Sequence, residues 1–219
     1  NRTIMQRRTA LKNIGLSFGA LTLTPTLASL IQSCQTTDPA WAPSFLSQES
    51  ALLIEKTIDV MLPTTANMPG ATDLNLIRFV DSYIENISSK EEQEFAKMAI
   101  DIYAGAAQTT AGKESIAALT SEDIDQQLND YLRPTPEKQA SRSKAFYAYM
   151  EAIEAGTAGS PPIEGICQNL LNNLKNLAVL AFKHNEVIAK EHMVYAPVPG
   201  QQKGCVDLQE ATGGKAWAL

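Results

Sequence analysis

Apolar residues recur every three or four positions along most of residues 48–193, which is the spacing of helices that bury one face. No stretch shows the sustained two-residue alternation of a half-buried strand. The expected helices cover residues 48–62, 74–87, about 90–111, about 121–132, 136–155 and 163–193. The pattern therefore predicts an all-α fold, a single compact helical bundle of about five or six helices within residues 47–194.

Start and stop signals agree with these boundaries. Ser47 is a candidate N-cap of the first helix, and Pro63 ends that helix because proline cannot continue the hydrogen-bond ladder. Ser88 and Ser89 each precede a glutamate by three positions, which is the spacing of a capping box. Pro136 follows Thr135 as a cap followed by proline at the first helical position. The starts of the helices are thus better defined than their ends.

The tail, residues 195–219, has a different composition. It is rich in glycine and proline and ends with an aromatic residue close to the terminus. Such a sequence predicts an extended C-terminal arm without helix. We expect its apolar and aromatic residues to contact another surface, on its own domain or on a partner chain. The candidate contact residues are Tyr195, Pro197, Pro199 and Trp217.

The first 33 residues resemble an export signal of the twin-arginine type. Arg7 and Arg8 precede a weakly apolar, glycine- and threonine-rich stretch over 14–31. The position after Thr9 is alanine, where this pattern often has an aromatic residue. A membrane-spanning anchor is the alternative, but the stretch is barely long enough and Pro25 interrupts it. We therefore predict a cleaved leader.

Cys34 stands where the apolar stretch ends. Ile31 lies three positions before it and Ser33 directly before it, which resembles a lipoprotein box, with Gln32 as the departure from the pattern. We predict that Cys34 is lipidated and that residues 34–46 form a flexible tether; a stray cysteine after the leader is the alternative. Acyl chains on one residue would hold the protein on the periplasmic side of a bacterial membrane.

The two remaining cysteines, Cys167 and Cys205, have three possible states. They could pair with each other, pair with a partner chain, or stay free. In an oxidising compartment we rank the intrachain disulfide first.

Charge and composition limit the function. The net charge is −6, and no basic stripe follows the leader, which argues against a nucleic-acid partner. The only histidines, His184 and His192, lack the spacing of a zinc or carboxylate-bridged metal site. Signatures for a serine nucleophile, a phosphate cradle, a dinucleotide fold or haem attachment are also missing. We therefore assign no catalytic, cofactor-binding or metal-binding residue to this chain.

Four segments in order resemble the gluconate 2-dehydrogenase subunit 3 family. They are the Arg-Arg leader, residues 59–65 (DVMLPTT), residues 69–71 (PGA) with 79–81 (FVD), and residues 195–200 (YAPVPG) with Gly204 and Cys205. The resemblance implies a helical, non-catalytic accessory subunit that has no cofactor of its own. Its partner would be a large FAD-binding dehydrogenase that oxidises a sugar or sugar acid, with haem in a cytochrome c subunit or another membrane acceptor. It also implies help with maturation and export of that partner.

Two other functions remain open at this point. A stand-alone helical lipoprotein acting as a binding module would be a monomer with a closed surface and an internal pocket. An independent metalloenzyme would bind close to one metal ion per chain, and the histidine spacing speaks against it.

Overall fold

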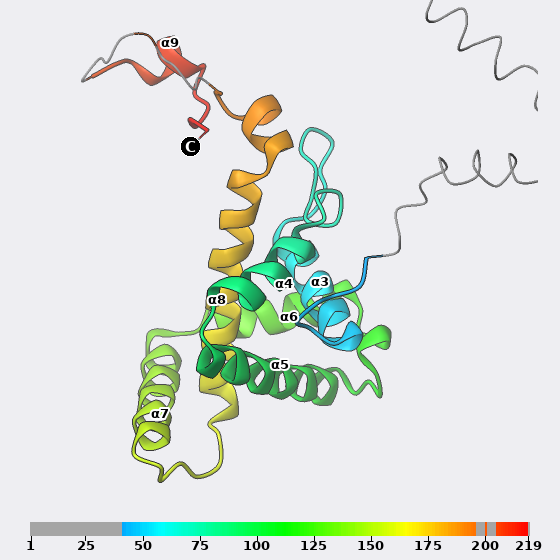
Figure 1. The fold of residues 1–219 in the computed structure, drawn as a ribbon, viewed down its shortest axis with the longest axis vertical. Helices are drawn as coiled ribbons and strands as arrows, with labels where there is room; N and C mark the ends of the chain where they lie inside the picture. Colours follow the sequence, from blue (N-terminus) through cyan, green and yellow to red (C-terminus); the bar gives the residue numbers. More distant parts are fainter. Residues whose placement is uncertain (1–40, 196–199, 201–204, 219) are drawn as a thin grey trace, which may run out of the picture. The chain divides into compact units, whose positions relative to one another are not determined.

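The structure is a computed structural model that describes residues 41–195, 200 and 205–218. Helices form most of this part of the chain and no strand occurs within it (Figure 1), so the all-α prediction is confirmed. The leader with Arg7 and Arg8, the lipidation site Cys34, and Pro197 and Pro199 lie outside the described residues.

The helices of the described chain follow one another in sequence order. They are α3 (Gln48–Met61), α4 (Leu76–Ile87), α5 (Lys90–Ala111), the 3₁₀ turn η1 (Ile116–Ala118), α6 (Ser121–Leu132), α7 (Pro136–Glu154), α8 (Ile163–His184), the π-helical turn η2 (Ile188–His192) and α9 (Leu208–Thr212).

The predicted helix starts are confirmed by their caps. The Ser47 side chain accepts a hydrogen bond from the Ser50 amide, and Ser89 forms a complete capping box with Glu92. Thr120 caps α6, and Thr135 caps α7 ahead of Pro136. Local sequence alone therefore defines where these helices begin.

The long helix expected over 163–193 is wrong in its second part. α8 ends at His184, because Asn185 adopts an extended backbone and its side-chain oxygen accepts a hydrogen bond from the Val187 amide at 3.0 Å. This local turn competes with the helix for the backbone groups. The chain then resumes as the single π-helical turn η2.

The tail also departs from the prediction of a helix-free arm. α9 forms within it, capped by the Asp207 side chain, which accepts from the Glu210 amide at 3.0 Å, and closed by the left-handed Gly213. The chain then returns to the end of η2, where the Val194 amide donates to Ala216 O and the Ala218 amide donates to Val194 O, both at 2.9 Å.

α8 lies at the centre of the helical body. It packs against α4, α5, α6 and α7 and contacts α3 (Figure 1). The inward face of its first half is buried, with Ile166, Cys167 and Leu171 fully inaccessible. The first turn of α8 lies so close to α7 that a Cβ on Gly165 would come within 2.8 Å of the Arg142 carbonyl oxygen. A glycine inside a helix is costly, and this close approach explains it.

Candidate interaction surfaces

The loop between α3 and α4 contains two of the segments singled out in the sequence, and it is held internally. The Ala71 amide donates to Leu62 O at 2.8 Å, and Gly70 lies so close to Thr64 that a Cβ would come within 2.4 Å of its amide nitrogen. The Asp73 carboxylate accepts from the Thr64 hydroxyl and the Gly70 amide, and these hydrogen bonds lower its pKa. The residues of this motif therefore close a loop.

Asp81, from the FVD segment, fastens the chain where it enters the helical body. Its buried carboxylate accepts from the backbone amides of Ser44, Phe45 and Leu46 at 2.8–3.1 Å and from the Ser44 hydroxyl. Burial alone would raise the pKa of Asp81, but these hydrogen bonds outweigh it and hold the pKa below its usual value. The end of the predicted tether is therefore fixed to α4.

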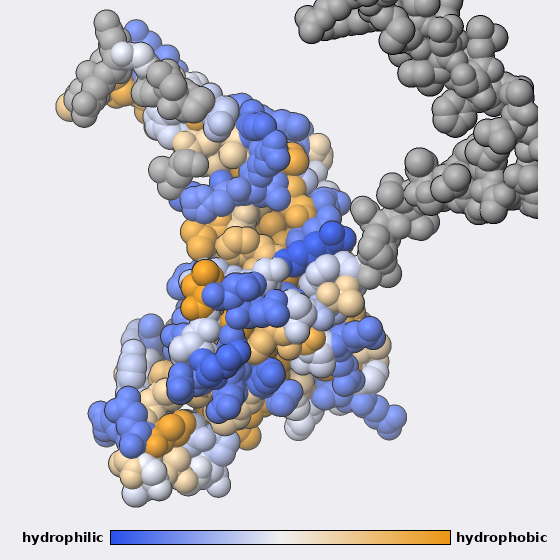
Figure 2. All heavy atoms as spheres, viewed as in Figure 1, coloured by the Kyte–Doolittle hydropathy of each residue, from blue (hydrophilic) through white to orange (hydrophobic). Residues whose placement is uncertain are grey.

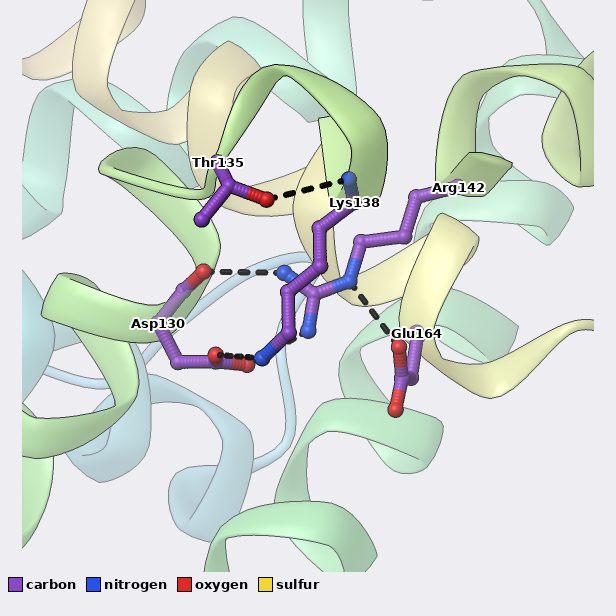
Figure 3. A network of polar contacts seen from close by, with 5 residues as sticks. All are labelled: Asp130, Thr135, Lys138, Arg142 and Glu164. Carbon is purple, nitrogen blue, oxygen red and sulfur yellow. Dashed lines mark hydrogen bonds and ion pairs between the residues drawn. The ribbon is translucent and has the colours of Figure 1, made fainter. Parts of the chain in front are cut away.

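Arg142 links three helices through a buried guanidinium (Figure 3). It donates to Asp130 O on α6 at 2.8 Å, and it pairs with the Asp130 carboxylate at 2.5 Å and with Glu164 on α8 at 3.0 Å. The guanidinium also lies 4.8 Å from the ring centroid of Tyr131. Both carboxylates are partly exposed, so this network joins helices and leaves no buried charge unpaired.

The predicted disulfide between Cys167 and Cys205 does not form; both thiols are free. Cys167 is buried in the core beside Tyr131, and burial raises the pKa of its thiol to about 11. Cys205 is exposed on the chain before α9. A thiol sealed inside the packed helices cannot reach a solvent-facing thiol without opening the core. A disulfide from Cys205 to a partner chain stays a prediction.

The C-terminal segment, residues 194–195 and 205–218 as described, exposes large apolar side chains. Tyr195 and Trp217 are brought to the same place because the bridge between Val194 and Trp217 joins their backbones. Both are about half exposed, as are Val206 and Leu208 near the start of α9. Two of the four predicted contact residues are therefore close along the backbone and accessible.

A second apolar surface, which we call the apolar groove, runs along α8 between α4, α5 and α7. It has a volume of about 970 Å³. Ile84, Phe95, Met150, Ile153, Leu170 and Leu177 are among its lining residues. The charged residues in the lining, Glu91, Glu92 and Glu154, are all acidic.

The part of the chain that the structure describes contains no cluster of metal-ligating side chains. No three His, Cys, Asp or Glu residues there gather closely enough to hold a metal ion. His184 ends α8 and His192 ends η2, each without an acidic partner within ion-pair distance. Among the same residues no helix combines the length and apolarity needed to span a bilayer.

A comparison with known families decides which proteins this chain resembles. The sequence model of the family described as gluconate 2-dehydrogenase subunit 3 matches residues 48–200. The chain belongs to the gluconate 2-dehydrogenase subunit 3 family. A search of curated proteins and of solved structures finds no match. The family match covers every helix of the body from α3 to η2 and ends just before Cys205 and α9.

The sequence did not reveal the apolar groove. Its lining comes from five helices, α3, α4, α5, α7 and α8, and helical periodicity cannot show which apolar faces meet and which stay open. The hydrogen-bonding roles of Asp81 and Arg142 were also missed, because their partners are far away in the sequence. A charged residue on an otherwise apolar helix face, as Asp81 is beside Val80, is the signal that could have pointed to them.

Proposed function

We propose that this chain is a non-catalytic accessory subunit of a periplasmic, FAD-dependent dehydrogenase of the GMC type that oxidises a sugar or sugar acid. The observation that carries the proposal is the family match over residues 48–200, because the family is named as one subunit of a gluconate dehydrogenase complex. In this proposal FAD is bound by the large subunit, and haem belongs to a third, cytochrome c subunit. The chain itself binds no cofactor.

The C-terminal segment supplies the contact with the large subunit in this proposal. Exposed aromatic residues such as Tyr195 and Trp217 are typical anchors of protein interfaces, since they bury a large area with few rotatable bonds. Cys205 lies on the same segment and is exposed, so a disulfide to the large subunit is sterically possible there.

Export and anchoring complete the proposal. A flavoprotein folds around FAD in the cytoplasm, and the twin-arginine route accepts folded cargo. One leader, with Arg7 and Arg8, could therefore export both subunits as a preformed complex. Lipid on Cys34 would then hold the complex on the periplasmic side of the membrane.

Changing the leader tests the shared export. We expect R7K/R8K to leave both this chain and the FAD enzyme in the cytoplasm, while the enzyme keeps its flavin. Fractionation with immunodetection of both subunits measures this. Export of the flavoprotein in the presence of the trapped variant would contradict the role in export.

Changing Cys34 tests the anchor separately. C34A should abolish labelling with radioactive palmitate and release the complex into the periplasmic fraction, with dehydrogenase activity retained. Persistent membrane attachment of this variant would refute lipid anchoring and leave the subunit role untouched.

The stand-alone binding module is distinguished by co-purification. An affinity-tagged chain purified from membranes in mild detergent should retain a flavoprotein in equimolar amount. A monomer that never retains one would favour the binding module instead.

A further inference from the structure

Contact through the C-terminal segment does not account for the apolar groove. Its floor consists of fully buried side chains such as Ile54 and Val80, and its walls come from helices that contact α8 but leave a gap between them. A well-packed body of this size would ordinarily fill such a space. An open cavity of about 970 Å³ with an apolar lining therefore has the character of a binding site.

The groove is long and narrow along α8. Its residues on this helix run from Asn169 to Leu180, which corresponds to roughly 16 Å at 1.5 Å rise per residue. Leu170, Leu174 and Leu177 follow one another at helical spacing along this wall. A length of about three turns fits a helical peptide whose anchors repeat at i, i+3 or i+4, and i+7.

Charge indicates which peptide would bind. Glu91 and Glu92 lie at the start of α5 and Glu154 at the end of α7, and no lysine or arginine belongs to the lining. Hydrogen bonds at the helix start lower the pKa of Glu91, so this residue stays ionised at neutral pH. An acidic rim around an apolar floor favours a segment with apolar anchors flanked by lysine or arginine.

The groove also leads toward the C-terminal segment. Leu180, one of its lining residues, lies near the end of α8, and the exposed Val187 follows next to η2. Figure 2 shows hydrophobic side chains gathered over the outer part of α8, between the body and η2. One partner could therefore cover the groove and the C-terminal segment together.

We propose that the apolar groove binds a helical segment of the large flavoprotein subunit that has apolar anchors flanked by basic residues. This inference rests on the proposed function and adds a second contact to the one at the C-terminal segment. The groove then holds one element of the partner while Tyr195 and Trp217 hold another.

Site-specific photocrosslinking in the native complex tests this proposal. The crosslinking residue p-benzoyl-phenylalanine is placed at Ile153 or Leu177 in the groove, at Trp217 in the C-terminal segment, or at the exposed Tyr147 on α7 as a control outside the lining. The full chain is expressed in its host, irradiated in membranes, and the crosslinked peptide is identified by mass spectrometry. We expect the groove positions to capture one lysine- or arginine-flanked apolar segment of the flavoprotein, and Tyr147 to capture none.

The outcomes separate the two proposals. One outcome would overturn the groove proposal and leave the proposed function intact. In it, Trp217 crosslinks to the flavoprotein, while the groove positions give no protein crosslink, a lipid adduct or an acidic segment. No flavoprotein crosslink at any position would overturn both.

Reversing the charge of the rim gives an independent readout. E91K/E154K should lower the yield of the groove crosslink at Leu177 about tenfold or more, because two attractive pairs become repulsive. E137K is the matched control, since Glu137 also lies exposed in the first turn of a helix but outside the groove. Equal yields from wild type and E91K/E154K would contradict the charge argument, and a far-UV spectrum and thermal midpoint close to those of wild type show that the variant is folded.

Discussion

The two halves of α8 are made of similar residues and have different surroundings. The first half buries Ile166, Cys167 and Leu171 completely among the neighbouring helices. In the second half Val179 and Leu180 remain about 40% exposed, and Val187 beyond the helix end is similarly open. Leucine and valine gain about 1.5–3 kcal/mol each when they are fully buried, so the second half leaves a favourable burial unused.

The first half of α8 belongs to the packed scaffold, and the second half carries exposed apolar surface. Beside the first half, the buried guanidinium of Arg142 is hydrogen-bonded to Asp130 and Glu164. Along the second half no such network covers the apolar side chains. Large exposed apolar surfaces on soluble domains mark sites of protein or membrane contact. One helix therefore stabilises the fold with one end and exposes apolar side chains at the other.

The largest expected effect comes from truncating one leucine in each half. L171A should destabilise the purified chain by about 2–5 kcal/mol, because it leaves a cavity in the core. L180A should change stability by no more than about 0.5 kcal/mol, since its side chain is partly exposed already. Urea unfolding followed by circular dichroism measures both. Equal losses for the two variants would remove the distinction between the halves.

A smaller effect is expected at the two helical glycines. G165A should cost about 1–3 kcal/mol, because the new methyl group meets the Arg142 carbonyl oxygen and Phe146. G105A on α5 serves as the control: a Cβ there has no neighbour within 4 Å, and it should stabilise the protein by about 0.5–1 kcal/mol. Thermal unfolding of both variants checks the signs, and a stabilising G165A would contradict the close packing of α7 on α8.

Asp81 should produce a pH-dependent effect. D81N replaces a carboxylate that accepts four hydrogen bonds, and it should cost about 1–2 kcal/mol at neutral pH. The folded pKa lies below the usual 3.8, so the contribution is present above that value and is lost as the pH falls through the folded pKa. Stability curves of wild type and D81N should therefore converge as the pH falls through the folded pKa of Asp81. A constant difference down to pH 2 would show that the carboxylate charge is irrelevant.

The cysteines should differ in reactivity with no change in stability. Iodoacetamide at pH 8 should alkylate Cys205 rapidly in the native protein, while Cys167 reacts only after unfolding, because its thiol is buried and has a raised pKa of about 11. Intact-mass analysis counts the adducts. Rapid double alkylation of the folded chain would show that the core around Cys167 is open.

The sequence predicted the helices well where local chemistry decides the structure. Caps such as Ser89 with Glu92 and Thr135 with Pro136 act within one turn, so they can be recognised without knowing the fold. The end of α8 at Asn185 was missed because the apolar helical periodicity continues past this residue. The periodicity does not show that the Asn185 side chain accepts a backbone hydrogen bond and starts a turn. The helix α9 was missed because glycine and proline dominate the composition around it.

The candidate interface was predictable only in part. Aromatic residues in a glycine-rich tail indicated Tyr195 and Trp217, which are both exposed, and their contact with a partner stays a prediction. The disulfide was wrong, because the number of cysteines does not reveal that Cys167 faces the core. The groove depends on how five helices are spaced, which no local signal in the sequence specifies.

We propose that this chain is a helical scaffold and that its exposed apolar surface binds a flavoprotein subunit. The most direct test of this claim is the flavin content and subunit ratio of the complex purified through a tag on this chain, for wild type and for W217A. We predict one flavoprotein with one FAD per wild-type chain, and a colourless, folded W217A chain that has lost the partner. A wild-type chain that emerges alone, whether it is colourless or oxidises a sugar with flavin of its own, would contradict the claim.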